Sequence, residues 1–174
     1  DKRINMIKQT GHEKVSHEFA PVFDKNSKVL ILGTFPSVKS REQNFYYGHP
    51  KNRFWKVMAR LTDSEVPQTI EEKKALLLVN GIAVWDVVAS CEIVGSSDSS
   101  IKNVVPADLD RILSQCEIRA IYANGSTAKR LYEKYSLKAT GREIFGLPST
   151  SPANCRVTYE ELYRVYSGIC RYLL

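Results

Sequence analysis

One stretch of the sequence, GTFPSVKSREQNFYYGHPKNRFW, carries glycine and proline turns, six aromatic rings and four cationic side chains. Its glycine and prolines let the backbone turn sharply and expose amide groups to a ligand. Three consecutive rings offer a flat surface on which a nucleobase can stack, an interaction favourable by roughly 1 to 3 kcal/mol per base; they are Phe45, Tyr46 and Tyr47. Polar and cationic groups near the start of the stretch are candidates for phosphate contacts: Ser37, Lys39 and Arg41.

Asn52, near the end of this stretch, has an amide that both donates and accepts hydrogen bonds and can therefore hold a water molecule. The same side chain can cap the helix that begins beside it, and different atoms of one residue can serve both roles. Phe54 and Trp55 recur at helical spacing and are expected in the core. Tyr47 lies in a loop of Gly, His and Pro where deep burial is awkward, so packing and ligand contact both stay open for it.

The net charge of +6 is unevenly distributed. Six bases and one acid lie between Gly33 and Arg60, which accounts for five of the six net positive charges. Residues 61–100 hold seven acids and two lysines. This asymmetry favours a positive face that suits a polyanion, although an ordinary solvated surface gives the same pattern.

The composition, 174 residues with 43% hydrophobic content, predicts one globular domain. No apolar run is long enough to span a bilayer, and residues 1–9 lack the apolar core of a secretory signal, so we expect a soluble, cytoplasmic protein. The four cysteines are too far apart for the usual zinc or iron-sulfur motifs and are predicted to be buried free thiols: Cys91, Cys116, Cys155 and Cys170.

Apolar runs alternate with amphipathic segments along the chain. Four runs are predicted strands: Lys28–Leu32, Gly81–Val88, Ile118–Ala123 and Arg142–Phe145. Three segments are predicted helices: Asn52–Leu61, Ile70–Val79 and Thr127–Tyr135. A last helix is expected to begin at Thr158, which with Glu161 forms a capping-box pattern. Its predicted apolar face consists of Leu162, Val165, Tyr166, Ile169 and Leu173.

This alternation indicates an α/β fold whose parallel sheet is covered by helices on both faces. Ligands bind such folds where loops leave the carboxyl ends of the strands. We therefore expect the site in the loops that follow Leu32, Trp85, Ala123 and Phe145. Residues 95–100 (GSSDSS) are predicted to be a flexible polar loop, and residues 1–20 a polar N-terminal extension.

Two segments resemble a known family. GTFPS followed by YGHPKNRFWKV resembles the first active-site motif of the uracil-DNA glycosylase superfamily, most closely in its hypoxanthine-DNA (deoxyinosine) glycosylase branch. GHPKNRFWKV is also similar to the mismatch-specific uracil-DNA glycosylases, and LPSTSPAN at residues 147–154 resembles the branch's second motif. The resemblance implies a three-layer α/β/α sandwich with a central, mostly parallel four-stranded sheet, and makes residues 21–174 a single glycosylase-like domain.

The resemblance implies hydrolysis of the bond between a damaged base and deoxyribose, after the nucleotide is rotated out of the duplex. It makes the first loop the base pocket, with Tyr47 as the stacking aromatic and Asn52 as the residue that holds the attacking water. It places the second motif in the minor groove, with DNA contacts expected from Ser149, Thr150, Ser151 and Asn154. Lys39 and Lys51 are interpreted as phosphate contacts rather than as the amine nucleophile of a lyase.

Three positions of the predicted base pocket depart from the usual pattern of the superfamily. Many members have Asp or Asn where this chain has Phe35, and a phenyl ring cannot polarise water, so either activity is lost or another side chain takes the role. The resemblance to the deoxyinosine branch places that role at Asn52. Leu147 stands where a His or Asn is common, which leaves backbone amides to stabilise the departing base. Asp86 falls where relatives read the base edge, and its carboxylate can accept the N1 hydrogen of hypoxanthine; capping or ion pairing is the alternative role.

The sequence therefore predicts a monofunctional, cofactor-free and metal-free glycosylase that removes hypoxanthine from DNA. We expect it to act as a monomer, in the cytoplasm and on the nucleoid. Two alternatives stay open: uracil, xanthine or a mismatched base as the true substrate, and a catalytically silent DNA-binding module of the same fold.

Overall fold

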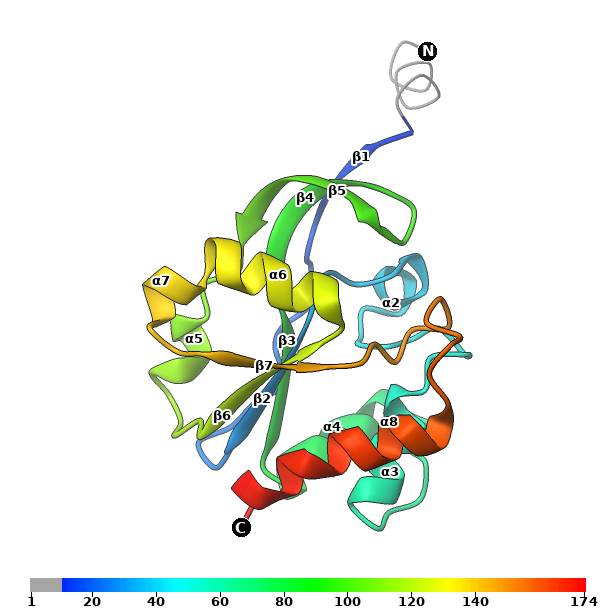
Figure 1. The fold of residues 1–174 in the computed structure, drawn as a ribbon, viewed down its shortest axis with the longest axis vertical. Coiled ribbons are helices and arrows are strands. Elements are labelled where there is room, and N and C mark those ends of the chain that lie inside the picture. The colour runs from blue at the N-terminus through cyan, green and yellow to red at the C-terminus, as the bar shows by residue number, and fades with distance from the viewer. Residues whose placement is uncertain (1–10) are drawn as a thin grey trace.

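The computed structural model describes residues 11–174, and a four-stranded sheet lies at its centre (Figure 1). Its strands are all parallel and run in the order β3-β2-β6-β7. Their bounds are Val29–Gly33 for β2, Ile82–Asp86 for β3, Ala120–Asn124 for β6 and Ile144–Leu147 for β7. Every residue of β2, β3 and β6 is buried, as expected of continuous apolar strands covered on both faces. The predicted parallel sheet is confirmed.

Helices cover both faces of this sheet, α6 and α7 on one side and α3, α4 and α8 on the other (Figure 1). The longer ones are α3 (Phe54–Leu61), α4 (Ile70–Val79), α6 (Ser126–Tyr135) and α8 (Tyr159–Tyr166). Shorter ones are α2 (Val38–Gln43), α5 (Asp110–Leu113), α7 (Leu137–Thr140) and the 3₁₀ helix η1 (Ser167–Tyr172). The four predicted helices are thus present.

The last helix differs in detail from its prediction. The Thr158 hydroxyl accepts a hydrogen bond from the Glu161 amide, and the α-helix ends at Tyr166, where η1 continues the chain. Leu162, Tyr166 and Ile169 are buried as predicted, whereas Val165 is 39% exposed. Ile169 lies in η1 and is buried in the core.

A second, antiparallel sheet was not predicted. It has the order β1-β4-β5, with bounds Glu13–Ser16, Val88–Val94 and Ser97–Pro106. The predicted strand over residues 81–88 therefore divides, because β4 begins two residues after β3 ends. Residues 95–100, predicted as a flexible loop, form the turn of the β4–β5 hairpin and the start of β5, where Gly95 adopts a positive φ of 55°.

Part of the predicted N-terminal extension joins the fold. Residues 13–16 pair as β1 with β4, and Phe19 packs against the core. Residues 1–10 lie outside the described residues.

All four cysteines are free thiols, but they are not uniformly buried: Cys91 is buried, Cys116 and Cys170 are half-buried, and Cys155 is exposed. Over residues 11–174 no cluster of His, Cys, Asp or Glu side chains could hold a metal ion. Within the same residues, no helix is long and apolar enough to cross a bilayer.

Candidate functional site

A cavity of about 940 Å³ opens at the carboxyl ends of the parallel strands. It receives side chains from all four strand ends, including Phe35, Asp86, Asn124 and Leu147. Of these four, Asn124 was not predicted as a site residue. The other predicted site residues that line the cavity are Ser37, Tyr47, Asn52, Ser149, Thr150, Ser151 and Asn154. The volume falls within the range of pockets that enclose small organic ligands.

Tyr47 presents the one ring of the predicted aromatic run that is not fully buried, since Phe45 and Tyr46 are 3% and 2% exposed. Its ring stacks on Phe54 with centroids 4.0 Å apart. Its φ of 53° is rare for a residue with a side chain, and the surrounding packing must hold it there. Burial raises the pKa of the Tyr47 hydroxyl well above its usual range, so the phenol stays neutral.

Asn52 lies where the first loop enters α3. Its Oδ1 accepts a hydrogen bond of 3.0 Å from the amide of Phe54, the first residue of α3, so Asn52 holds the start of the helix although the N-cap residue itself is Arg53. This bond also fixes which end of the amide is oxygen, because the Phe54 N–H needs an acceptor. Nδ2 is therefore the group left to donate into the cavity that Asn52 lines.

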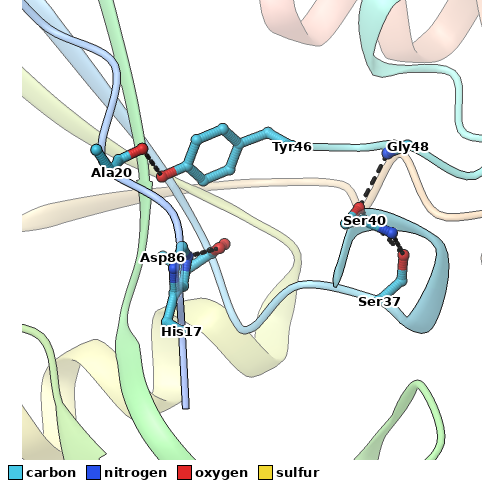
Figure 2. A network of polar contacts seen from close by, with 7 residues as sticks. All are labelled: His17, Ala20, Ser37, Ser40, Tyr46, Gly48 and Asp86. Carbon is cyan, nitrogen blue, oxygen red and sulfur yellow. Dashed lines mark hydrogen bonds and ion pairs between the residues drawn. The ribbon is translucent and has the colours of Figure 1, made fainter. Parts of the chain in front are cut away.

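Asp86 ends β3, where the sheet register pairs it with Gly33 at the end of β2. The residue is 4% exposed and lines the cavity. Its Oδ2 accepts a hydrogen bond of 2.8 Å from His17 Nε2, as Figure 2 shows. A Cβ at Gly33 would lie closer than 3.0 Å to Asp86 Oδ1 and 3.1 Å from Tyr47 Oη, so only glycine leaves room for both groups.

The second motif forms a loop that is tied to the core. Thr150 is fully buried, its amide donates to Asn124 Oδ1 and its hydroxyl accepts from Asn124 Nδ2, both at 3.0 Å. The Thr150 side chain therefore holds the loop, and the DNA contact predicted for this residue stays a prediction. Ser149, Ser151 and Asn154 are half-buried at the cavity wall.

Arg53 joins the two motifs. Its backbone amide donates to Thr150 O at 3.1 Å. Its guanidinium donates to the carbonyls of Val157, Ser151 and Asn154, the last at 2.8 Å. The sequence gives no sign of this role, because the carbonyls that Arg53 binds lie about a hundred residues further along the chain.

The three residues predicted to contact phosphate do not all lie at the cavity. Ser37 lines the cavity, and its side chain accepts from the Ser40 amide as the cap of α2 (Figure 2). Lys39 and Arg41 lie outside the cavity wall. Lys39 is exposed and pairs with Glu42 at 3.4 Å, whereas Arg41 donates to Gly95 O of the hairpin turn at 2.9 Å and lies over the Phe35 ring.

Asp98 is a cavity residue that the sequence did not reveal. It projects from the β4–β5 hairpin, which was expected to be a loop. Burial raises the pKa of Asp98 to about 6; a hydrogen bond from Thr34 opposes this rise, and the charge of Asp86 adds to it. Two carboxyl groups thus face one cavity.

Comparisons with known proteins all point to uracil DNA glycosylases and their relatives. The family model described as the uracil DNA glycosylase superfamily matches residues 20–165. The hypoxanthine DNA glycosylase of Methanosarcina acetivorans is 35% identical over 144 residues, which span 82% of this chain and 90% of that protein. Its counterpart in Methanosarcina barkeri is 33% identical over 141 residues, or 79% and 87% of the two chains. The solution NMR structure of a Methanosarcina acetivorans protein described as a uracil DNA glycosylase superposes with a TM-score of 0.74 at 33% identity, covering 89% of this chain and 96% of that one.

Proposed function

This chain belongs to the uracil DNA glycosylase superfamily, and on that premise we propose that it removes hypoxanthine from DNA by hydrolysing the N-glycosidic bond. It is a DNA glycosylase of base excision repair, an enzyme class that extrudes its target nucleotide from the stack. The proposal of hypoxanthine is supported by the two Methanosarcina relatives that bear this name. It is carried by one observation: Tyr47, Asp86 and Asn52 share the wall of a single cavity.

Each of these residues has a distinct part. The Tyr47 ring, fixed from behind by Phe54, offers a surface on which the extruded base stacks. Asp86 keeps one oxygen on His17 and can offer the other to the base edge. Hypoxanthine has an N–H at N1 and gives that hydrogen to a carboxylate, whereas adenine has a lone pair there, which a carboxylate repels.

The chemical step is dissociative in this proposal. Bond breaking leaves positive charge on the sugar, which the DNA phosphates favour, and negative charge on the base, which backbone amides of the two loops stabilise. Asn52 Nδ2 holds a water molecule whose oxygen bonds to the sugar cation, and the proton that this water gives up neutralises the departed base anion. Phe35 and Leu147 supply no polar group, so they shape the cavity without taking part in this step.

The test uses duplexes that contain inosine, uracil or xanthine, followed by alkali to reveal abasic sites. We expect cleavage of the inosine strand. If the protein cleaves the uracil or xanthine duplex much faster, that base is the substrate instead of hypoxanthine. If it binds the duplexes and cleaves none of the three, it is a catalytically silent DNA-binding module.

Asn52→Ala tests the catalytic assignment. We expect turnover to fall by at least about 100-fold with little change in DNA affinity. Asn80→Ala is the matched control, because Asn80 also makes a hydrogen bond at a helix end, to Leu76 O at 2.7 Å, and does not line the cavity. If both variants lose only stability and keep wild-type turnover, Asn52 is a helix cap and nothing more.

A further inference from the structure

His17 lies behind the candidate base-reading carboxylate, in the segment that the sequence placed outside the domain. Pairing of β1 with β4 brings it there, and its own amide donates to Ala89 O at 2.8 Å. The His17 and Asp86 side chains are 4% and 5% exposed, and Nε2 and Oδ2 are 2.8 Å apart. Among residues 11–174, His17 is the one residue whose side chain donates a hydrogen bond to the Asp86 carboxylate.

The imidazole is held in one orientation by aromatic rings. Phe19 lies 4.4 Å from it between centroids, Tyr46 lies 5.9 Å away, and Phe35 meets it edge-on at 6.2 Å. Tyr46 is itself fixed by a hydrogen bond of 2.8 Å from its hydroxyl to Ala20 O, next to His17 in Figure 2. The Nε2–H group therefore points at Asp86 without freedom to turn elsewhere.

A packing role alone does not account for a histidine here. Its Nδ1 is buried and has no hydrogen-bond partner within the part of the chain that the structure describes. Burying an unsatisfied ring nitrogen costs stability, and an apolar ring would fill the same space without that cost. The bond to Asp86 is the feature that an apolar ring cannot supply.

This bond decides how Asp86 meets a substrate. With Oδ2 occupied by His17, the carboxylate cannot rotate freely, and Oδ1 remains beside Gly33. An acceptor held in this way bonds well to a base that has an N–H at its edge and repels a base that has a lone pair there. Without the histidine, the carboxyl group can turn and loses that distinction.

We propose that His17 is a positioning residue that sets base specificity by holding the Asp86 carboxylate as a fixed hydrogen-bond acceptor. The inference rests on the proposed function, because it takes the extruded base to be a purine with an N–H at N1.

Two variants that replace His17 by amide side chains of different length test this proposal. His17→Gln carries its amide nitrogen about as far out as Nε2 and can still donate to Asp86, whereas His17→Asn is too short to do so. The control is His12→Asn, which alters a histidine bound to Ser100 O at 2.9 Å on the same small sheet and does not touch Asp86.

Binding is measured by fluorescence anisotropy with duplexes that carry non-cleavable 2′-fluoroarabino analogues of inosine or of nebularine, a purine with no N–H at N1. We expect the wild type, His17→Gln and His12→Asn to prefer the inosine duplex. His17→Asn should lose most of that preference and about 10- to 100-fold in inosine kcat/KM, the loss expected for one hydrogen bond to a charged group.

The possible outcomes distinguish failure of the role proposed for His17 from failure of the proposed glycosylase function. If the wild type cleaves inosine and folded His17→Asn keeps the wild-type preference, His17 is a structural anchor and the inference fails. If His17→Asn does not fold, loss of the preference in His17→Gln overturns the inference and its retention supports it. A wild type that cleaves no inosine refutes the proposed function instead.

Discussion

Replacing Gly33 by alanine places one methyl group at the most crowded point of the site. The new Cβ would lie closer than 3.0 Å to Asp86 Oδ1 and 3.1 Å from Tyr47 Oη. Neither group can retreat easily. Asp86 is held by His17 at 2.8 Å, and Tyr47 is stacked on Phe54 with centroids 4.0 Å apart. The methyl group must therefore displace the two side chains that we assign to base recognition.

The expected size of the effect follows from these contacts. Overpacking of a rigid, buried region costs about 1 to 3 kcal/mol of the free energy of unfolding. A displaced Asp86 also loses its bond to the base, and a hydrogen bond to a charged group contributes about 1.5 to 3 kcal/mol. At about 1.36 kcal/mol for each tenfold change, kcat/KM for inosine should fall by roughly 10- to 100-fold.

The assay compares single-turnover inosine cleavage and thermal unfolding of Gly33→Ala with those of Gly168→Ala. Gly168 is the matched control, because a Cβ there meets no atom within 4 Å and the residue does not line the cavity. Gly168→Ala should keep wild-type activity and stability. Wild-type kcat/KM in Gly33→Ala would show that neither Asp86 nor Tyr47 needs its present position, and would refute the assignment of both.

Two further predictions concern charge. Joint replacement of Lys39 and Arg41 by alanine should weaken the dependence of DNA affinity on salt concentration. The slope of log affinity against log salt concentration should decrease in magnitude by about 0.9 for each phosphate that the variant no longer binds. An unchanged slope would mean that this part of α2 faces away from DNA. The Asp98 carboxyl, with its pKa raised from 3.8 to about 6, keeps its proton in the folded state at pH values where the unfolded chain has released it. The free energy of unfolding should therefore fall as pH rises from about 4 to 6. Asp98→Asn should reduce the accompanying fall in Tm over this pH range. If Tm falls as steeply with pH in the variant as in the wild type, another group takes up the proton.

The central sheet and the long helices were predictable because each has a periodic pattern of its own. The strands from Val29, Ile82 and Ala120 are continuous apolar runs, and such runs indicate burial on both faces without knowledge of their partners. Capping at Thr158 likewise depends on neighbours within one turn. These elements are specified locally, and their order along the chain then restricts the topology.

The small sheet was not predictable for the opposite reason. β1 has four mostly exposed residues and exists because β4 pairs with it. The β4–β5 ladder contains register shifts, and these interrupt the alternation by which a strand is recognised. Missing this sheet also meant missing His17 and Asp98, because their side chains reach the cavity region only through its strands. Apart from Asp86, the site residues that were found lie within the two quoted motifs, whereas those that the small sheet brings to the cavity region were missed.

The link through Arg53 bears on how the two motifs act together. Asn52 directly precedes Arg53, whose guanidinium and amide hold four carbonyls of the second motif and the residues after it. The residue proposed to hold water and the loop expected to enter the minor groove therefore belong to one rigid unit. Capture of the sugar needs the reacting atoms placed to within a fraction of an ångström. A loop that contacted DNA independently of Asn52 would lose that placement whenever it moved. A loop held to Asn52 through Arg53 keeps the DNA strand and the water molecule in one fixed geometry.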